Sequence, residues 1–183
     1  MVVETRFAGE IMDIFDAFSE RHSIRAFTDQ TVTDDALRKI FEAVNRAPSA
    51  GNLQAFDIYQ VTKTEHKQAI MRASYDQEFL VQAPVVLVFC AVPARSAVRY
   101  TERGETLYCI QDATIACTFA MLAATALGLG SVWVGAFDED AVHKIIGAEP
   151  GHRPVAMLPI GYRNETPRIR PRRALEDIIH RVG

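Results

Sequence analysis

ATIACTFAMLAATALGLGSVWVGAF, residues 113–137, carries no charged side chain from its first residue to its last. A run of this length could span a bilayer. However, Gly128 and Gly130 interrupt it, and the residues on either side lack the bias of Lys or Arg that flanks membrane helices. Glycine is the usual residue just after a helix. The stretch therefore predicts a buried helix that ends near Leu127, a glycine turn and a short buried strand at Ser131–Phe137, with no membrane span.

The other elements follow from apolar periodicity and from helix-start and helix-stop signals. Helices are predicted from Ile11 to about Glu20, from Thr33 to just before Pro48, from Thr64 onward, from Asp138 to Gly147, and briefly around Leu175–Ile179. Strands are predicted at Phe56–Val61, Val85–Val92 and Val155–Ile160. The polar residues 93–104 are expected to form an excursion on the surface. Strands interspersed among helices, without a linker, predict one α+β domain spanning residues 1–183.

Composition narrows the class of protein. A net charge of -3 and a pI near 6.0 argue against nucleic acid as the main partner. Cys90, Cys109 and Cys117 lie in apolar surroundings without a CxxC pair, so reduced thiols and a cytoplasmic location are expected. The histidines lack metal-ligand spacing, and no metal site is predicted. No signal peptide is visible in residues 1–20, which carry acids throughout.

A first candidate binding segment is Arg21-His22-Ser23-Ile24-Arg25. In an extended conformation, its two-residue period places Arg21, Ser23 and Arg25 on one side and His22 and Ile24 on the other. That side would present charge-assisted donors to an anion such as phosphate. Alternatively, cations just after a helix stabilise its negative end. This alternative explains the first arginine but not the alternation that follows it.

Arginines also gather near the other end of the chain, at Arg168, Arg170, Arg172 and Arg173. Their partial two-residue spacing would place guanidinium groups on one side of an extended stretch. The plainer interpretation is a solvated basic tail. These arginines could form a second half of a phosphate site only if this end of the chain folds back.

The segment Pro48–Gln54 concentrates small residues and amides in a turn. Such a turn suits the close approach of a flat ligand with polar edges, although Ser, Gly and Asn are also ordinary residues of the turn after a helix. Gln111 and Asp112 precede the uncharged run, and we expect both at the edge of burial, because buried acids are rare unless paired.

Two familiar motifs are rejected. Gly128 and Gly130 follow a helix and precede a strand, whereas the glycines of a dinucleotide-binding fold lie between a strand and the helix that it opens. Ser49 has no nucleophile elbow around it, and no His–Asp set stands at a recognisable spacing. No side chain is therefore predicted to be catalytic.

Taken in order, these segments resemble the nitroreductase family of FMN-dependent oxidoreductases over nearly the whole chain. The matching motifs are Arg21–Phe27, Ala47–Gln54, the apolar helix running into Gly128–Phe137, Leu158–Tyr162 and the arginines before Ala174. The resemblance implies a three-layer α/β/α fold with a central mixed, mostly antiparallel sheet. It also implies an intertwined homodimer with FMN in the subunit interface, which would bury the uncharged helix. The pattern from Tyr100 to Asp112 is similar to a compact subgroup.

The resemblance also implies which residues hold FMN. Arg21, His22, Ser23 and Arg25 would bind its phosphate and ribityl side from one subunit. Ser49, Ala50, Asn52 and, as a further candidate, Gln54 would come from the partner subunit. The backbone of Val134 and Gly135 would face the flavin ring. Arg170 or Arg172, with Arg173 as a close rival, would complete the phosphate site.

The implied activity is reduction of electron-poor acceptors of nitro, quinone or enone type by NADH or NADPH. Hydride would pass through the flavin in a ping-pong sequence in one shared pocket. Arg95, Arg99 and Arg103 are candidates for setting the nicotinamide preference. Three alternatives stay open: fragmentation of reduced FMN to dimethylbenzimidazole, a non-catalytic FMN-binding or sensing protein, and an unrelated α/β binding domain.

Overall fold

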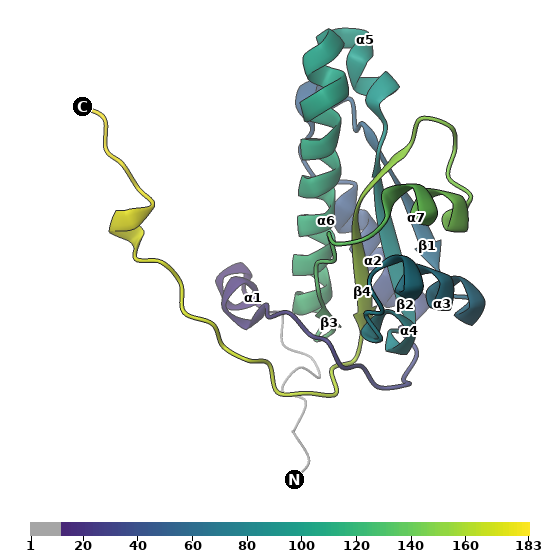
Figure 1. Cartoon of the computed structure of the whole chain (residues 1–183). Coiled ribbons are helices and arrows are strands. Elements are labelled where there is room, and N and C mark those ends of the chain that lie inside the picture. Colours follow the sequence, from purple (N-terminus) through teal and green to yellow (C-terminus); the bar gives the residue numbers. More distant parts are fainter. Residues whose placement is uncertain (1–11) are drawn as a thin grey trace.

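A four-stranded antiparallel sheet forms the centre of the molecule in the computed structural model, which describes residues 12–183 (Figure 1). Its strands are β1 (Phe56–Val61), β2 (Val85–Ala91), β3 (Gly130–Ser131) and β4 (Arg153–Gly161), in the order β1-β2-β4-β3. Each neighbouring pair is antiparallel, and a single parallel bridge joins Ser23 to Ser131 at the edge. Ile11, at the start of the first predicted helix, lies outside the described residues.

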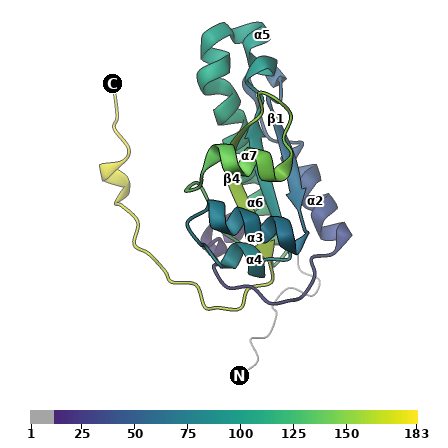
Figure 2. The same ribbon diagram turned by 45° about the vertical axis from the view of Figure 1, so that its right-hand side comes forward.

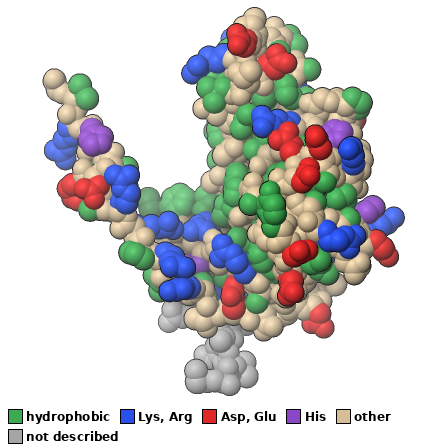
Figure 3. Space-filling view, viewed as in Figure 1, with side chains coloured by type: hydrophobic (Ala, Val, Ile, Leu, Met, Phe, Trp, Pro, Cys, Tyr) green, Lys and Arg blue, Asp and Glu red, His purple; other side chains and the backbone are tan. Residues whose placement is uncertain are grey.

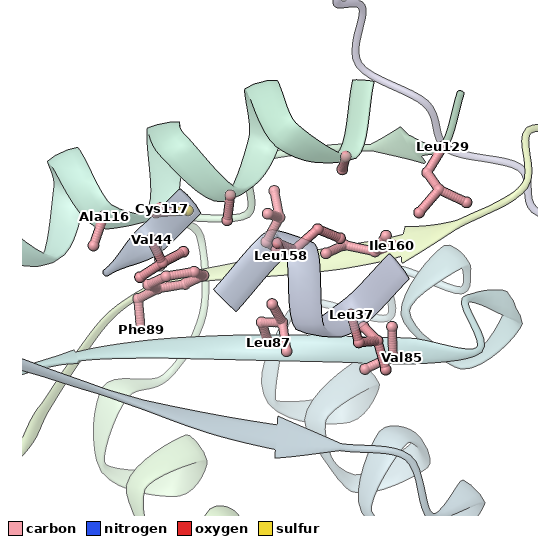
Figure 4. Close-up of a cluster of buried hydrophobic side chains, with 14 of the residues drawn as sticks. Leu37, Val44, Val85, Leu87, Phe89, Ala116, Cys117, Leu129, Leu158 and Ile160 are labelled. Atoms are coloured by element: carbon pink, nitrogen blue, oxygen red, sulfur yellow. The ribbon is translucent and has the colours of Figure 1, made fainter. Parts of the chain in front are cut away.

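Helices cover both faces of this sheet. On one face lie α2 (Asp34–Val44) and α6 (Cys109–Ala126); on the other lie α3 (Thr64–Ala73), α4 (Phe79–Gln82) and α7 (Glu139–Ile146) (Figures 1 and 2). Alternate side chains of β2 pack in the cores on opposite faces of the sheet. Leu87 and Phe89 pack with α2 and α6 (Figure 4), and Val86 and Val88 pack with α3 and α7. Burial on both faces explains the continuous apolar run of β2, and the predicted three-layer α+β arrangement is confirmed.

The predicted helix boundaries near polar caps are confirmed. The Thr33 hydroxyl accepts a hydrogen bond from the Ala36 N–H at 3.2 Å, and Asp138 Oδ1 accepts one from Ala141 at 2.9 Å. Each bond satisfies one of the unpaired donors in the first turn of a helix. Gly147 ends α7 in the left-handed conformation, with φ +61°, that glycine adopts without strain.

The stretch expected to form an excursion on the surface lies mostly at the surface and is helical there: α5 (Pro93–Arg103) begins with proline in its first turn and continues through a π-helix, Gly104–Tyr108, into α6. The strand expected at Ser131–Phe137 is reduced to β3 and a single bridge from Val134 to Met157. The helical stretch from α5 through α6 is long and apolar enough to cross a membrane by length and composition, which is weak evidence because core helices pass the same test.

Gly104 allows α5 and the π-helix to pack closely. A Cβ atom at this position would lie 2.6 Å from the Ser96 carbonyl oxygen and 2.9 Å from Tyr100 Cβ. We expect Gly104→Ala to lower the free energy of unfolding by about 1–3 kcal/mol, the usual cost of overpacking. Urea denaturation measures this change, and Val98→Ala on the exposed surface of α5 is the control, for which we expect a change within about 0.5 kcal/mol. An unchanged midpoint in Gly104→Ala would contradict the packing described.

Both ends of the described chain lie apart from the sheet. The helix α1 (Ile14–Glu20) packs on α6, yet its Ile14, Phe15 and Phe18 side chains are exposed. Residues 164–183, here called the C-terminal arm, extend away from the body (Figures 1 and 2). The short helix predicted in this arm is a single 3-10 turn, Leu175–Asp177.

Candidate functional site

The segment after α1 is extended and pairs with the sheet edge. Ser23 forms a bridge with Ser131, and the Ile24 N–H donates to the Ser131 carbonyl at 3.0 Å. Ile24 is buried while Ser23 and Arg25 are exposed, as the alternation predicted. His22 is half-buried, with its Nδ1 3.0 Å from the Glu20 carbonyl oxygen. The Arg25 side chain is thereby directed outward, while its backbone N–H donates to the Glu165 carboxylate.

Arg21 lies at the junction of this segment with α6. Its Nη1 is 3.9 Å from the Met121 sulfur, and the side chain is partly buried. The pKa of Arg21 is lowered, first because burial removes water from the guanidinium and second because the positive charge of Arg172 is near. The charge of Arg172 thus acts on Arg21, although the two residues lie near opposite ends of the sequence.

The arginines of the C-terminal arm differ in their surroundings. Arg172 is the one whose charge acts on Arg21 within the described chain. Arg173 donates to the Asp177 carbonyl inside the arm, and Arg170 and Arg172 are both exposed. Figure 3 shows Lys and Arg side chains gathered where the arm leaves the body, beside the exposed hydrophobic side chains near α1. Two like charges held together in this way favour an anion between them.

The turn between α2 and β1 has an unusual backbone. Gly51, Asn52 and Gln54 have φ values of +56°, +58° and +47°. Left-handed conformations are uncommon for residues other than glycine and need support from the surroundings. The Ser49 hydroxyl provides part of that support, because it accepts a hydrogen bond from the Gln54 N–H at 2.9 Å.

Asp112 supplies the rest of the support, and its predicted place at the edge of burial is wrong. The side chain is 1% exposed. Its Oδ1 accepts a hydrogen bond from the Ala50 N–H at 2.9 Å, and its Oδ2 accepts one from the Ala55 N–H at 3.2 Å. One carboxylate on α6 therefore ties down both ends of the turn, a charge-assisted arrangement that compensates its burial. The neighbouring Gln111 is exposed, as predicted.

Arg95 of α5 holds the turn from the other side. Its Nη1 donates to the Gln54 carbonyl at 2.7 Å and to the Phe56 carbonyl at 3.1 Å. The same guanidinium forms an ion pair with Asp57 at 3.2 Å. Arg95 therefore has a structural role here, which the sequence did not reveal.

Val134 and Gly135 differ in what their backbone can offer a ligand. The N–H and the carbonyl of Val134 both pair with Met157 at 2.9 Å, so its backbone is already satisfied by the sheet. Gly135 is exposed and lies beside the Trp133 ring. Of the two predicted ring-facing residues, Gly135 is the one that remains accessible.

A cavity of about 510 Å³ adjoins the turn and the first half of α6. Ser49, Ala50, Tyr108, Gln111 and Thr114 contribute to its lining. A second cavity, of about 580 Å³, lies on the outer face of α2. The cavity at the turn is the one that contains predicted site residues, and we regard it as the candidate site.

The two halves of the predicted site are separate within one chain. Arg21 contacts α6 at Met121, whereas the turn contacts α6 at Asp112, nine residues earlier. Nine residues of helix correspond to about 14 Å along its axis at 1.5 Å per residue. A ligand that contacts both halves must therefore lie between two copies of the chain or extend about 14 Å along α6.

The cysteine thiols are poor candidates for nucleophilic chemistry. Burial raises the pKa of Cys90 to about 12, with smaller contributions from the carboxylates of Asp57 and Glu139. Burial also raises the pKa of Cys117, and of Cys109 to a smaller degree. Because the thiolate is the reactive form, these residues are unreactive at neutral pH.

Known proteins resemble this chain in sequence. The sequence model of the nitroreductase family matches residues 18–77 and 67–162. The FMN reductase (NAD(P)H) of Bacillus subtilis is 29% identical over 181 residues, covering 92% of this chain and 73% of its own. The oxygen-insensitive NADPH nitroreductase of Salmonella typhimurium is 27% identical over 165 residues, covering 86% of this chain and 69% of its own.

Solved structures agree with the sequence comparison. The structure of the NADPH:FMN oxidoreductase of Vibrio harveyi, complexed with NAD+, matches with a TM-score of 0.85 at 25% identity, over 93% of this chain and 77% of that one. The fold predicted from the sequence is therefore confirmed. By its motifs, its architecture and its match over most of its length, this chain belongs to the nitroreductase family.

Proposed function

We propose that the chain, acting as one domain over residues 1–183, is an FMN-dependent oxidoreductase in which NADH or NADPH reduces nitro, quinone or enone acceptors. The observation that carries the proposal is the match of the nitroreductase family model over residues 18–77 and 67–162. Arg21 and Arg172, whose positive charges act on one another, would together suit a doubly charged phosphate. The family to which the chain belongs supports the choice of FMN as the group that bears this phosphate.

Each part of the candidate site has a task in this proposal. Arg21 and Arg172 bind the phosphate, and His22, Ser23 and Arg25 lie beside them along the extended segment. Ser49, Asn52 and Gln54 would offer a hydroxyl and side-chain amides to the polar edge of the ring, and Ala50 would lie against it. FMN held by these residues would supply the hydride-transfer chemistry between nicotinamide and acceptor. Arginine charge near the ring would stabilise negative charge that develops there. No side chain is proposed as an acid or base.

We further propose that the active form is a homodimer. The helix α6 is apolar on all sides. Only 44% of the most apolar window in the α5–α6 stretch is buried within one chain, although an all-apolar helix needs burial all round. An antiparallel pairing of α6 with its copy across a two-fold axis would bring Met121 of one chain toward Asp112 of the other. The two halves of the site would then meet.

The C-terminal arm fits the same assembly. More than half of each apolar side chain is exposed at Ile169, Leu175, Ile178 and Ile179, and Val182 is 98% exposed. Exposed apolar side chains on an extended arm are typical of a segment that packs on a partner. We propose that the arm lies on the second copy, and that the protein works in the cytoplasm, where thiols such as Cys90 stay reduced.

The visible absorption spectrum tests the cofactor, and anaerobic titration tests the activity. We expect the purified protein to contain FMN, or to take it up when it is added, and the flavin absorbance to bleach when NADH or NADPH is supplied without oxygen. A nitroaromatic or quinone should then restore the absorbance. A colourless protein that takes up no FMN would contradict the proposal. Bound flavin that neither nicotinamide bleaches would indicate a binding protein instead.

A further inference from the structure

The end of α5 lies directly over the turn of the candidate site. A Cβ atom at Gly51 would lie 2.6 Å from the Tyr100 hydroxyl and 2.9 Å from Arg99 Nη1. These two side chains therefore pack on the backbone of the turn where its conformation is left-handed. Tyr108, whose ring meets that of Tyr100, lines the cavity beside this turn.

Two arginine–tyrosine pairs form one cluster at this place. The Tyr100 and Tyr108 rings meet edge to face, with centroids 5.0 Å apart. The guanidinium carbon of Arg99 is 5.4 Å from the Tyr100 centroid, and that of Arg103 is 5.3 Å from the Tyr108 centroid. Arg103 Nε also donates to the Tyr108 hydroxyl at 2.9 Å. Stacking and this bond orient the guanidinium groups while leaving several N–H donors for a ligand.

These two arginines differ from the third one on the same helix. Arg95 is engaged by Asp57 and by two carbonyl groups, as described above. Neither Arg99 nor Arg103 forms an ion pair with a carboxylate among residues 12–183, although Glu102 and Glu105 are exposed nearby in the sequence. Their charge is therefore available to an anion from solution.

The backbone of this segment is held in an unfavourable conformation. Thr101 lies between the two arginines, with φ +46° and ψ -136°, a region that non-glycine residues rarely occupy. Such a conformation costs on the order of 1–3 kcal/mol and persists only where the surroundings enforce it. Here it lies between the two arginine–tyrosine pairs, at the step from α5 to the π-helix. A conformation of this kind is frequent at ligand sites.

We propose that Arg99 and Arg103 bind a phosphate monoester of a diffusible substrate, the 2′-phosphate of NADPH, and so favour NADPH over NADH. The proposal rests on the proposed function, because it requires the nicotinamide to bind beside the turn. A guanidinium fork matches a phosphate dianion, and tyrosine faces suit the adjoining adenine. The two nicotinamide cofactors differ only in this phosphate, so a cationic pair away from the reacting ring is sufficient to discriminate between them.

The same chemistry could hold the phosphate of a second FMN molecule that arrives as the acceptor. The double variant Arg99→Gln/Arg103→Gln, with Arg72→Gln on the exposed face of α3 as the matched control, separates the two sources. Calorimetric titration of the FMN-loaded protein with adenosine 2′,5′-bisphosphate and with adenosine 5′-monophosphate measures phosphate recognition without turnover. Rates with free FMN and with riboflavin as acceptors then measure recognition of a flavin phosphate.

We expect the wild-type protein and Arg72→Gln to bind the bisphosphate more tightly than the monophosphate. The double variant should lose about 10- to 100-fold in affinity for the bisphosphate, the usual effect of removing charged hydrogen bonds. Anaerobic flavin reduction by NADPH should slow at subsaturating concentration, while reduction by NADH stays within about twofold.

Equal affinity for the two adenosine nucleotides, or an unchanged bisphosphate affinity in the double variant, would overturn the proposal. A loss confined to FMN against riboflavin would overturn the assignment to NADPH and identify the acceptor as the source of the phosphate. Should the protein bind no FMN at all, the proposed function would fall. The same titration of the flavin-free protein would still decide whether Arg99 and Arg103 recognise the phosphate.

Discussion

Arg21→Ala is expected to weaken FMN binding by about 100-fold, the upper range for removing a charged partner of a phosphate. The guanidinium is partly buried against Met121 and lies near Arg172. Its loss therefore leaves the phosphate with roughly half of its positive charge in a poorly hydrated place. Fluorescence titration of the flavin-free protein measures the dissociation constant.

Controls separate this effect from general damage. Arg72→Ala removes an exposed arginine from α3 and should leave FMN affinity unchanged. On the arm, Arg172→Ala should weaken binding about 10-fold or more, and Arg168→Ala should not. The free energy of unfolding of flavin-free Arg21→Ala should stay within about 1 kcal/mol of wild type, because no carboxylate among residues 12–183 forms an ion pair with this arginine. Equal affinities for Arg21→Ala and Arg72→Ala would exclude Arg21 from the site.

The second large effect is expected for Asp112→Asn. An amide can accept a hydrogen bond with only one of its two ends, so either Ala50 or Ala55 loses its partner and faces an NH₂ group instead. A buried donor without a partner costs about 1–3 kcal/mol, and more where the lost partner was charged. We expect the free energy of unfolding to fall by about 2–4 kcal/mol.

Urea denaturation of the flavin-free protein measures this loss, and Gln111→Asn at the exposed neighbouring position is the control. FMN affinity should fall as well, because the turn from Ser49 to Gln54 would no longer be held in its left-handed conformation. A variant with wild-type stability and wild-type FMN affinity would show that Asp112 does not support the turn.

Regular elements with a clear physical signature could be predicted from the sequence. The run Val85–Ala91 is apolar throughout because both faces of β2 are covered, and Thr33 and Asp138 cap their helices as expected. Polar composition correctly placed residues 93–104 at the surface but did not show that they are helical. A solvent-facing helix is as polar as a loop, and the proline in the first turn was the signal that could have distinguished the two.

The strand prediction for the apolar segment after Gly130 was wrong for another reason. The segment is hydrophobic because Val132 and Val134 are buried in the core between the sheet and the helices α3, α4 and α7, and not because it pairs along a strand. Hydropathy reports removal from water and does not report which backbone groups are paired. Only Val134 continues the pairing beyond β3, through its bridge to Met157.

Features of the candidate site that depend on side-chain alternation could be predicted, whereas those that depend on backbone partners could not. In the segment from Arg21 to Arg25, alternate side chains lie on opposite faces, and the sequence alone indicates this. The sequence does not indicate the role of Asp112, because its partners are backbone N–H groups, which every residue except proline has. Which of Arg170, Arg172 and Arg173 acts on Arg21 depends on the path of the arm, which local sequence does not determine.

The most direct test of the central claim mixes two defective variants. If each site takes Arg21 and Arg172 from one chain and the turn from its partner, a dimer of one Arg21→Ala chain and one Asp112→Asn chain contains one intact site. After subunits are exchanged at random, tightly bound FMN should rise from near zero to about a quarter of the wild-type content. Flavin content that stays at the level of the separate variants, or a protein that remains monomeric, would contradict a site shared between two chains.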